Sequence, residues 1–125
     1  MEGNEITIFA LGSVVHEAYQ ASLDLKNEGV SVELINISSI RPMQKDRIIE
    51  SIQKTKKVLT VEEHSLHGGL GSIISEVIAD NGLNAKLRRL GISEGTFSKS
   101  GPREEIRSYY HLDRKGITNM VKDII

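Results

Sequence analysis

The chain has 125 residues, a length that can bury one hydrophobic core, so a single domain over residues 1–125 is predicted. Its 16 Lys and Arg residues and 17 Asp and Glu residues give a net charge of −1, with both signs interleaved. That balance argues against nucleic acid and against an anionic membrane surface as partners. Cysteine is absent, which excludes disulfides, a thiolate nucleophile and a zinc–cysteine site.

The start of the chain shows no targeting signal. Met1 to Glu5 lack the basic and apolar blocks of a signal peptide, and the apolar runs elsewhere are only a few residues long. We therefore expect a cytoplasmic protein. Because a core-like strand pattern begins directly at Ile6, the chain opens as a piece of a longer protein would.

The first half of the chain alternates strand and helix patterns. Residues 6–11 predict a strand, and Gly12 and Ser13 lead into an apolar helical stripe over residues 14–25. Ser13 is expected to cap this helix at its start, and Gly29 at its end. The next elements are a strand over residues 30–37, a loop at Arg41-Pro42, and a short helix over residues 45–53.

The second half repeats the alternation and then adds helices. Residues 56–61 predict the third strand and residues 72–80 most of the third helix. Residues 84–90 predict a fourth strand with one face less covered, because Lys86, Arg88 and Arg89 interrupt its apolar residues. A helix start is predicted at Ser100, and a last helix from near Asp113.

These repeated strand–helix units predict an α/β fold. Right-handed crossovers between such units give a mainly parallel sheet of about four strands, with helices on both faces, in a three-layer α/β/α sandwich. Ligands and partners of such sheets meet the carboxyl ends of the strands. The Gly12-Ser13 turn and the segment from Glu62 to Gly71 are therefore expected to lie near each other.

The glycine-rich turn Gly68-Gly69-Leu70-Gly71 follows a strand and opens a helix, a context in which backbone amides can approach a phosphate. It matches neither the dinucleotide fingerprint nor a Walker loop, and the carboxylates nearby would repel an anion. A tight turn or an interface packing point is the favoured interpretation, and phosphate binding is the alternative.

Glu62-Glu63-His64, together with His67, can be interpreted as acid–base groups or as metal ligands. Adjacent residues at a strand end point to opposite sides, so at most one of Glu62 and Glu63 can join a given site. A loop with no further ligand in sight is poorly organised for a metal ion. Polar contact across an interface, or hydrogen bonding to the turn itself, is favoured.

Three further polar positions have alternative interpretations. Arg41 is either a solvated turn residue or a contact for a carboxylate or phosphate. Ser13 is favoured as a cap over a nucleophile, because no nucleophile-elbow motif surrounds it. His16 and His111 are isolated, which indicates surface or packing roles. The residue pattern alone therefore predicts an α/β domain without a convincing catalytic set.

A resemblance extends this interpretation. Thr60-Val61-Glu62-Glu63-His64 followed by Gly68-Gly69-Leu70-Gly71-Ser72 resembles the signature of the C-terminal domain of transketolases. It is also similar to the β subunits of 2-oxo acid dehydrogenases and to deoxyxylulose-phosphate synthase. Further similar segments are 2–8, 37–42, 91–101 and 109–117, so that nearly the whole chain is covered. His64 and the run from Phe97 to Gly101 look most like the transketolase branch, whereas Arg41 is more typical of the dehydrogenase subunits.

The resemblance implies a parent enzyme that uses thiamine diphosphate and Mg²⁺ to move two-carbon ketol units between sugar phosphates, as in the pentose phosphate pathway. It also implies that catalysis occurs elsewhere, because the family holds the cofactor through a Gly-Asp-Gly motif in its first domain and activates it with a glutamate of the middle domain. This chain has no Gly-Asp-Gly. No catalytic, cofactor-binding or metal residue is therefore predicted, and this domain is expected to bind no cofactor itself.

The implied role is an interface. Its partners would be the N-terminal and middle domains or subunit of the parent, a homodimer or heterotetramer. The candidate interface or anion edge, called here the carboxyl-end edge, consists of Gly12, Ser13, Arg41, Glu62, Glu63, His64, Gly68, Gly69 and Gly71. The alternatives are a dehydrogenase β-subunit domain that docks an acyltransferase core, and a free-standing anion-binding module.

The family's C-terminal domain also has an antiparallel first strand that precedes the segment present here. If most of that strand is missing, four parallel strands remain in the order 2-1-3-4, and the outer edge of the 30–37 strand is unpaired. An unpaired edge favours edge-to-edge association. The isolated chain is therefore expected to self-associate through that edge.

Overall fold

The structure is a computed structural model that describes residues 1–37, 44–65, 69–92 and 112–125, with residues 64, 65 and 92 described by their backbone only. The elements in chain order are β1 (Ile6–Leu11), the short 3-10 helix η1 (Gly12–Val14), α1 (Val15–Asn27), β2 (Val32–Asn36), α2 (Lys45–Thr55), β3 (Lys57–Ser65), α3 (Leu70–Asp80), β4 (Lys86–Ile92) and α5 (Arg114–Ile124). The expected helix start at Ser100 lies outside the described residues.

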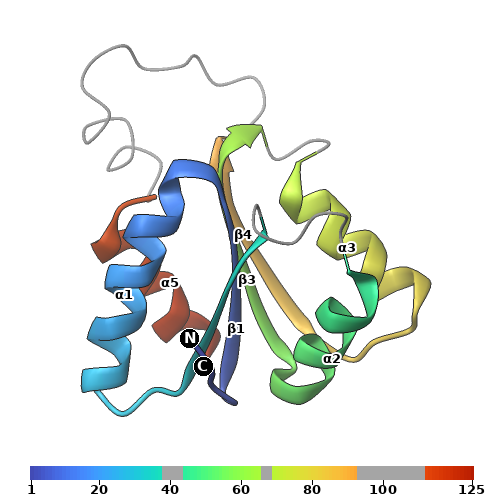
Figure 1. Ribbon diagram of the computed structural model, residues 1–125, viewed down its shortest axis with the longest axis horizontal. Coiled ribbons are helices and arrows are strands. Elements are labelled where there is room, and N and C mark those ends of the chain that lie inside the picture. Colours follow the sequence, from blue (N-terminus) through green and yellow to red (C-terminus); the bar gives the residue numbers. More distant parts are fainter. Residues whose placement is uncertain (38–43, 66–68, 93–111) are drawn as a thin grey trace.

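The strands form one parallel sheet in the order β2-β1-β3-β4, which confirms the predicted order. Helices α1 and α5 cover one face, and α2 and α3 cover the other (Figure 1). The predicted three-layer α/β/α sandwich is therefore confirmed. Within the described residues, no helix is both long enough and apolar enough to span a membrane.

The central strand β1 supplies both halves of the core. Ile6, Ile8 and Ala10 are fully buried against the α1 and α5 side, whereas Phe9 is fully buried against the α2 and α3 side. Side chains of a strand alternate between faces, and a strand covered on both faces is apolar throughout. This explains the unbroken apolar run that predicted the strand.

The main departure from the predicted elements concerns β3. The strand was expected to end at Val61 but continues to Ser65, with an irregularity in its pairing to β4 between these residues. Glu62, Glu63 and the backbone of His64 therefore belong to the strand itself. Helix α3 correspondingly begins at Leu70, two residues earlier than expected.

The outer edge of β2 is partly covered by the first residues of the chain. The Met1 carbonyl accepts a hydrogen bond from Leu34 N at 3.1 Å, and Glu5 N donates to the Ser31 carbonyl at 2.9 Å. The segment thus runs antiparallel beside the start of β2. A side chain on Gly3 would collide with the backbone of Val32. The expectation of a wholly unpaired edge is therefore wrong for this portion of β2.

At the opposite side of the sheet, β4 is less covered, as its sequence predicted. Arg88 and Arg89 are less buried than Leu90, which lies in the core. Charged side chains on an edge strand discourage pairing with another chain. The two edges of the sheet therefore differ in how they are protected.

Candidate functional site

Two strand ends meet at the carboxyl end of the sheet (Figure 1). Leu11 at the end of β1 is in register with Glu62 of β3, so η1 lies beside the end of β3. The Ser13 hydroxyl donates a hydrogen bond to Glu63 Oε2 at 3.3 Å. The predicted proximity of the Gly12-Ser13 turn to the Glu62 segment is thereby confirmed.

This contact replaces the expected role of Ser13 as a helix cap. The residue that precedes α1 is Val14, and no side chain makes a cap hydrogen bond there. Helix α1 is entered through the 3-10 turn η1, in which Gly12 has a φ of 82°. The prediction that Ser13 caps the helix is therefore wrong, because the chain turns before α1 begins and the hydroxyl contacts Glu63.

Glu62 and Glu63 project to opposite sides of the strand, as predicted. Glu62 is fully buried, and its Oε1 and Oε2 accept hydrogen bonds from Leu70 N at 2.9 Å and Gly71 N at 2.8 Å. Gly69, the residue before α3, has no side chain that could cap the helix. Glu62 therefore caps α3 from the neighbouring strand, and its negative charge lies at the positive end of the helix dipole.

The same hydrogen bonds bear on the glycine-rich turn. The amides of Leu70 and Gly71 are donors of the kind that cradle a phosphate at a helix start, and here both already donate to Glu62. A phosphate that used them would have to displace a buried carboxylate. The geometry thus favours the interpretation of this turn as a packing point.

Gly71 lets α3 approach the sheet closely. A Cβ at this position would lie 2.6 Å from Arg89 Cδ and 3.1 Å from Thr60 Oγ1. The Thr60 hydroxyl oxygen is buried and has no hydrogen-bond partner in the described part of the chain. Any side chain here would push the first turn of α3 away from β3 and β4.

The remaining members of the carboxyl-end edge are only partly visible. Arg41 and Gly68 lie outside the described residues, as does His67, and His64 is described by its backbone alone. Among the residues whose side chains are described, no group of three His, Asp or Glu side chains is arranged to hold a metal ion.

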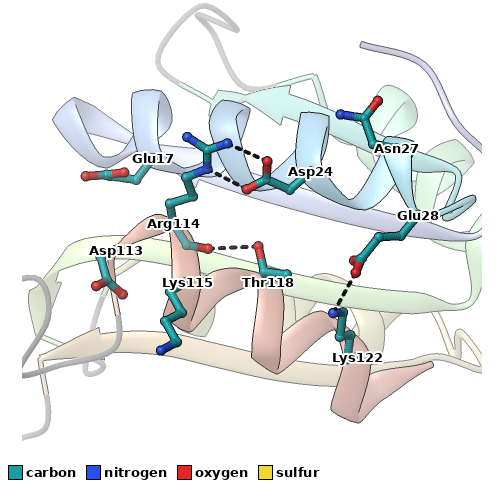
Figure 2. A pocket seen from close by; sticks show the side chains of 9 residues that line it. All are labelled: Glu17, Asp24, Asn27, Glu28, Asp113, Arg114, Lys115, Thr118 and Lys122. Carbon is teal, nitrogen blue, oxygen red and sulfur yellow. Dashed lines mark hydrogen bonds and ion pairs between the residues drawn. The ribbon is translucent and has the colours of Figure 1, made fainter.

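An open groove of about 640 Å³ between α1 and α5 was not predicted from the sequence. Figure 2 shows acidic side chains of α1 facing basic side chains of α5. Its lining residues are Glu17, Asp24, Asn27, Glu28, Asp113, Arg114, Lys115, Thr118 and Lys122. The helical spacing of the acids in residues 17–28 was the available signal, but which helix faces them depends on the tertiary fold.

The walls of this groove are bonded to each other. Arg114 donates from Nε and from one Nη to the two carboxylate oxygens of Asp24, both at 2.5 Å, and Lys122 donates to Glu28 at 3.0 Å. The hydrogen bond from Arg114 holds the pKa of Asp24 below its usual range and raises the pKa of Arg114. These two ion pairs, called here the α1–α5 clamp, join the helices.

A second unpredicted feature is a buried charge in β2. The Glu33 side chain is 1% exposed, and its Oε2 accepts a hydrogen bond from Lys54 Nζ at 2.6 Å and lies 3.6 Å from Arg47 Nη2. Burial alone would raise the pKa of Glu33, but hydrogen bonds from Lys54 and Ser51 and the two positive charges outweigh it and lower the pKa. A glutamate inside an apolar strand pattern was the available signal.

Nearly the whole chain is similar to one known family. Residues 1–117 match the family described as transketolase, C-terminal domain. A putative transketolase C-terminal section of Methanocaldococcus jannaschii is 42% identical over 124 residues, covering 98% of this chain and 38% of that protein. One of the two subunits of the apulose-4-phosphate transketolase of Actinobacillus succinogenes is 35% identical over 119 residues, covering 95% of this chain and 38% of that protein.

Further relatives agree with this picture. A 1-deoxy-D-xylulose-5-phosphate synthase of Halothermothrix orenii is 39% identical over 117 residues, which are 93% of this chain and 18% of that protein. A solved structure, described as a split gene transketolase in an inactive beta4 tetramer, superposes with a TM-score of 0.88 at 30% identity, over 98% of this chain and 40% of that one. The chain thus spans well under half the length of these relatives. It belongs to the transketolase C-terminal domain family.

Proposed function

We propose that this chain is the C-terminal domain, as a fragment or a separate subunit, of a thiamine-diphosphate-dependent transketolase that transfers two-carbon ketol units between sugar phosphates. The similarity to a transketolase C-terminal section and to a subunit of a two-chain transketolase supports this proposal. The chain covers 38% of each of those proteins, so the larger part of each would supply what this domain lacks.

Within that enzyme, the domain contributes an interface and no catalytic group. The observation that carries this view is the bonding of Glu62, whose two carboxylate oxygens both accept from α3 and are buried away from any substrate. Glu63 is likewise in contact with Ser13 of its own chain. Acid–base or cofactor chemistry needs a group that can reach the reacting atoms, and buried Glu62 cannot.

The proposed partners are the amino-terminal and middle domains or subunit of the same enzyme, in a homodimer or a heterotetramer. The superposed relative is described as an inactive tetramer, which supports the view that a chain of this type assembles without activity when alone. Thiamine diphosphate and Mg²⁺ would be held by the partner.

A co-purification experiment tests this proposal. The tagged chain is mixed with a transketolase amino-terminal subunit, or separately with the acyltransferase core of a 2-oxo acid dehydrogenase. Capture of the transketolase subunit is expected, and preferential capture of the acyltransferase would favour the dehydrogenase alternative. A Ser13→Arg substitution at the carboxyl-end edge should weaken capture, whereas Glu50→Arg on the outer surface of α2 should not.

A further inference from the structure

The amino terminus of α3 holds an anion that belongs to the chain itself. Glu62 Oε1 lies 2.9 Å from Leu70 N, and Oε2 lies 2.8 Å from Gly71 N. Both amides are in the first turn of α3, where backbone N–H groups have no partner within the helix. The carboxylate therefore binds here as a free anion would, except that β3 carries it into place.

A second group points to the same spot. The Thr60 side chain is fully buried, and its Oγ1 has no hydrogen-bond partner in the described part of the chain. This oxygen lies 3.1 Å from the position that a Cβ on Gly71 would occupy. Thr60 and Glu62 are two residues apart on β3 and share one face. The amides and the hydroxyl form a donor set that suits a carboxylate.

We propose that the amino terminus of α3 is a carboxylate-binding site that Glu62 fills in the intact chain, and that truncation of Glu62 opens it to a small free carboxylate. Glu62 is thus a positioning residue, which holds the turn before α3 against β3. The proposal rests on the geometry of this chain alone and holds whether or not the carboxyl-end edge docks a partner.

The test uses the full chain and three variants followed by ¹⁵N NMR. In the wild type, the Leu70 and Gly71 amides should exchange with solvent at least about tenfold more slowly than in an unstructured chain. Glu62→Ala should lose this protection, and sodium formate should restore the two amide signals in a saturable manner against sodium chloride at equal ionic strength. Glu63→Ala, changed at the neighbouring carboxylate on the opposite side of the strand, should keep the protection and ignore formate.

Two results would overturn the proposal. One is a folded Glu62→Ala variant whose Leu70 and Gly71 signals do not respond to formate, and the other is an equal response in Glu63→Ala. If Glu62→Ala does not fold, the Glu62→Gln variant decides. Its side chain keeps one acceptor oxygen, so only one of the two amides should stay protected, and unchanged protection of both would refute the role of the charge-bearing carboxylate.

Discussion

At the residue scale, Glu33 brings a carboxylate into the interior beneath α2, where Lys54 and Arg47 neutralise it. The pKa of Glu33 is lowered in the folded protein, so the ionised form is favoured by folding. The stabilisation it gives is fully present above the pKa of the unfolded chain and is lost as the pH falls through the lower folded value. This interaction therefore stabilises the protein at neutral pH and fails in acid.

Glu33→Gln removes that dependence. We expect the free energy of unfolding at pH 7 to fall by about 1 kcal/mol, because a charged hydrogen bond is lost while Lys54, which is 40% exposed, returns to water. Urea denaturation from about pH 7 to about pH 3 should show a smaller acid-induced loss in the variant than in the wild type. Glu50→Gln, on the outer surface of α2, is the control, and parallel curves for Glu33→Gln and the wild type would contradict this prediction.

Gly71 shows how one hydrogen atom admits a helix to the sheet. A methyl group there would lie 2.6 Å from Arg89 Cδ, so Gly71→Ala should be more destabilising in the wild type than in an Arg89→Ala background. We expect a coupling of about 1 kcal/mol in a double-mutant cycle measured by urea unfolding. Additive effects of the two substitutions would show that Arg89 does not close the space over Gly71.

At the element scale, the α1–α5 clamp fixes the last helix. The apolar residues Ile117, Val121 and Ile124 of α5 are buried, and the Asp24–Arg114 pair lies at the solvent edge of that contact. The apolar burial supplies most of the attachment, since exposed ion pairs contribute little. The ion pair instead favours one alignment of α5 along α1.

Substitution of Asp24 tests this alignment. Asp24→Arg should speed the hydrogen exchange of the α5 amides, and adding Arg114→Asp should restore slow exchange by re-forming the pair with reversed charges. The effect of the single substitution should shrink at high salt. Slow exchange that is unchanged in Asp24→Arg would mean that apolar packing alone aligns α5.

The β2 edge carries a prediction about association. The first residues cover this edge only where Met1 and Gly3 meet Leu34 and Val32. Self-association of the isolated chain through β2 therefore stays a prediction, and deletion of residues 1–3 should strengthen it. Leu34→Pro, which removes the outward N–H, should weaken it. Sedimentation velocity measures both, and a monodisperse monomer at high concentration in the deletion variant would contradict the prediction.

Elements were predictable where local periodicity decides them, and less so where tertiary contacts do. The apolar stripes of β1, α1 and α5 were identified from spacing because burial imposes that spacing. The extension of β3 to Ser65 was not predicted, because two glutamates and a histidine look like the end of a strand. Glu62 remains in the strand because its charge is satisfied by amides eight and nine residues later, which are brought close only by folding.

At the scale of the whole molecule, the parallel sheet and its helices followed from the order of the elements, whereas the charged contacts did not. The carboxyl-end edge was identified correctly as a place where Gly12-Ser13 meets Glu62-Glu63. The individual partners, Ser13 with Glu63 and Glu62 with α3, required the positions of all three elements. Arg41 and Gly68 remain predictions, because they lie outside the described residues.

The central claim is that this domain supports a thiamine diphosphate enzyme without holding the cofactor. Isothermal titration calorimetry of thiamine diphosphate with Mg²⁺ into the purified chain tests it most directly, with a complete transketolase titrated in parallel as the positive control. We predict no heat beyond dilution for this chain. Saturable binding in the micromolar range would contradict the claim.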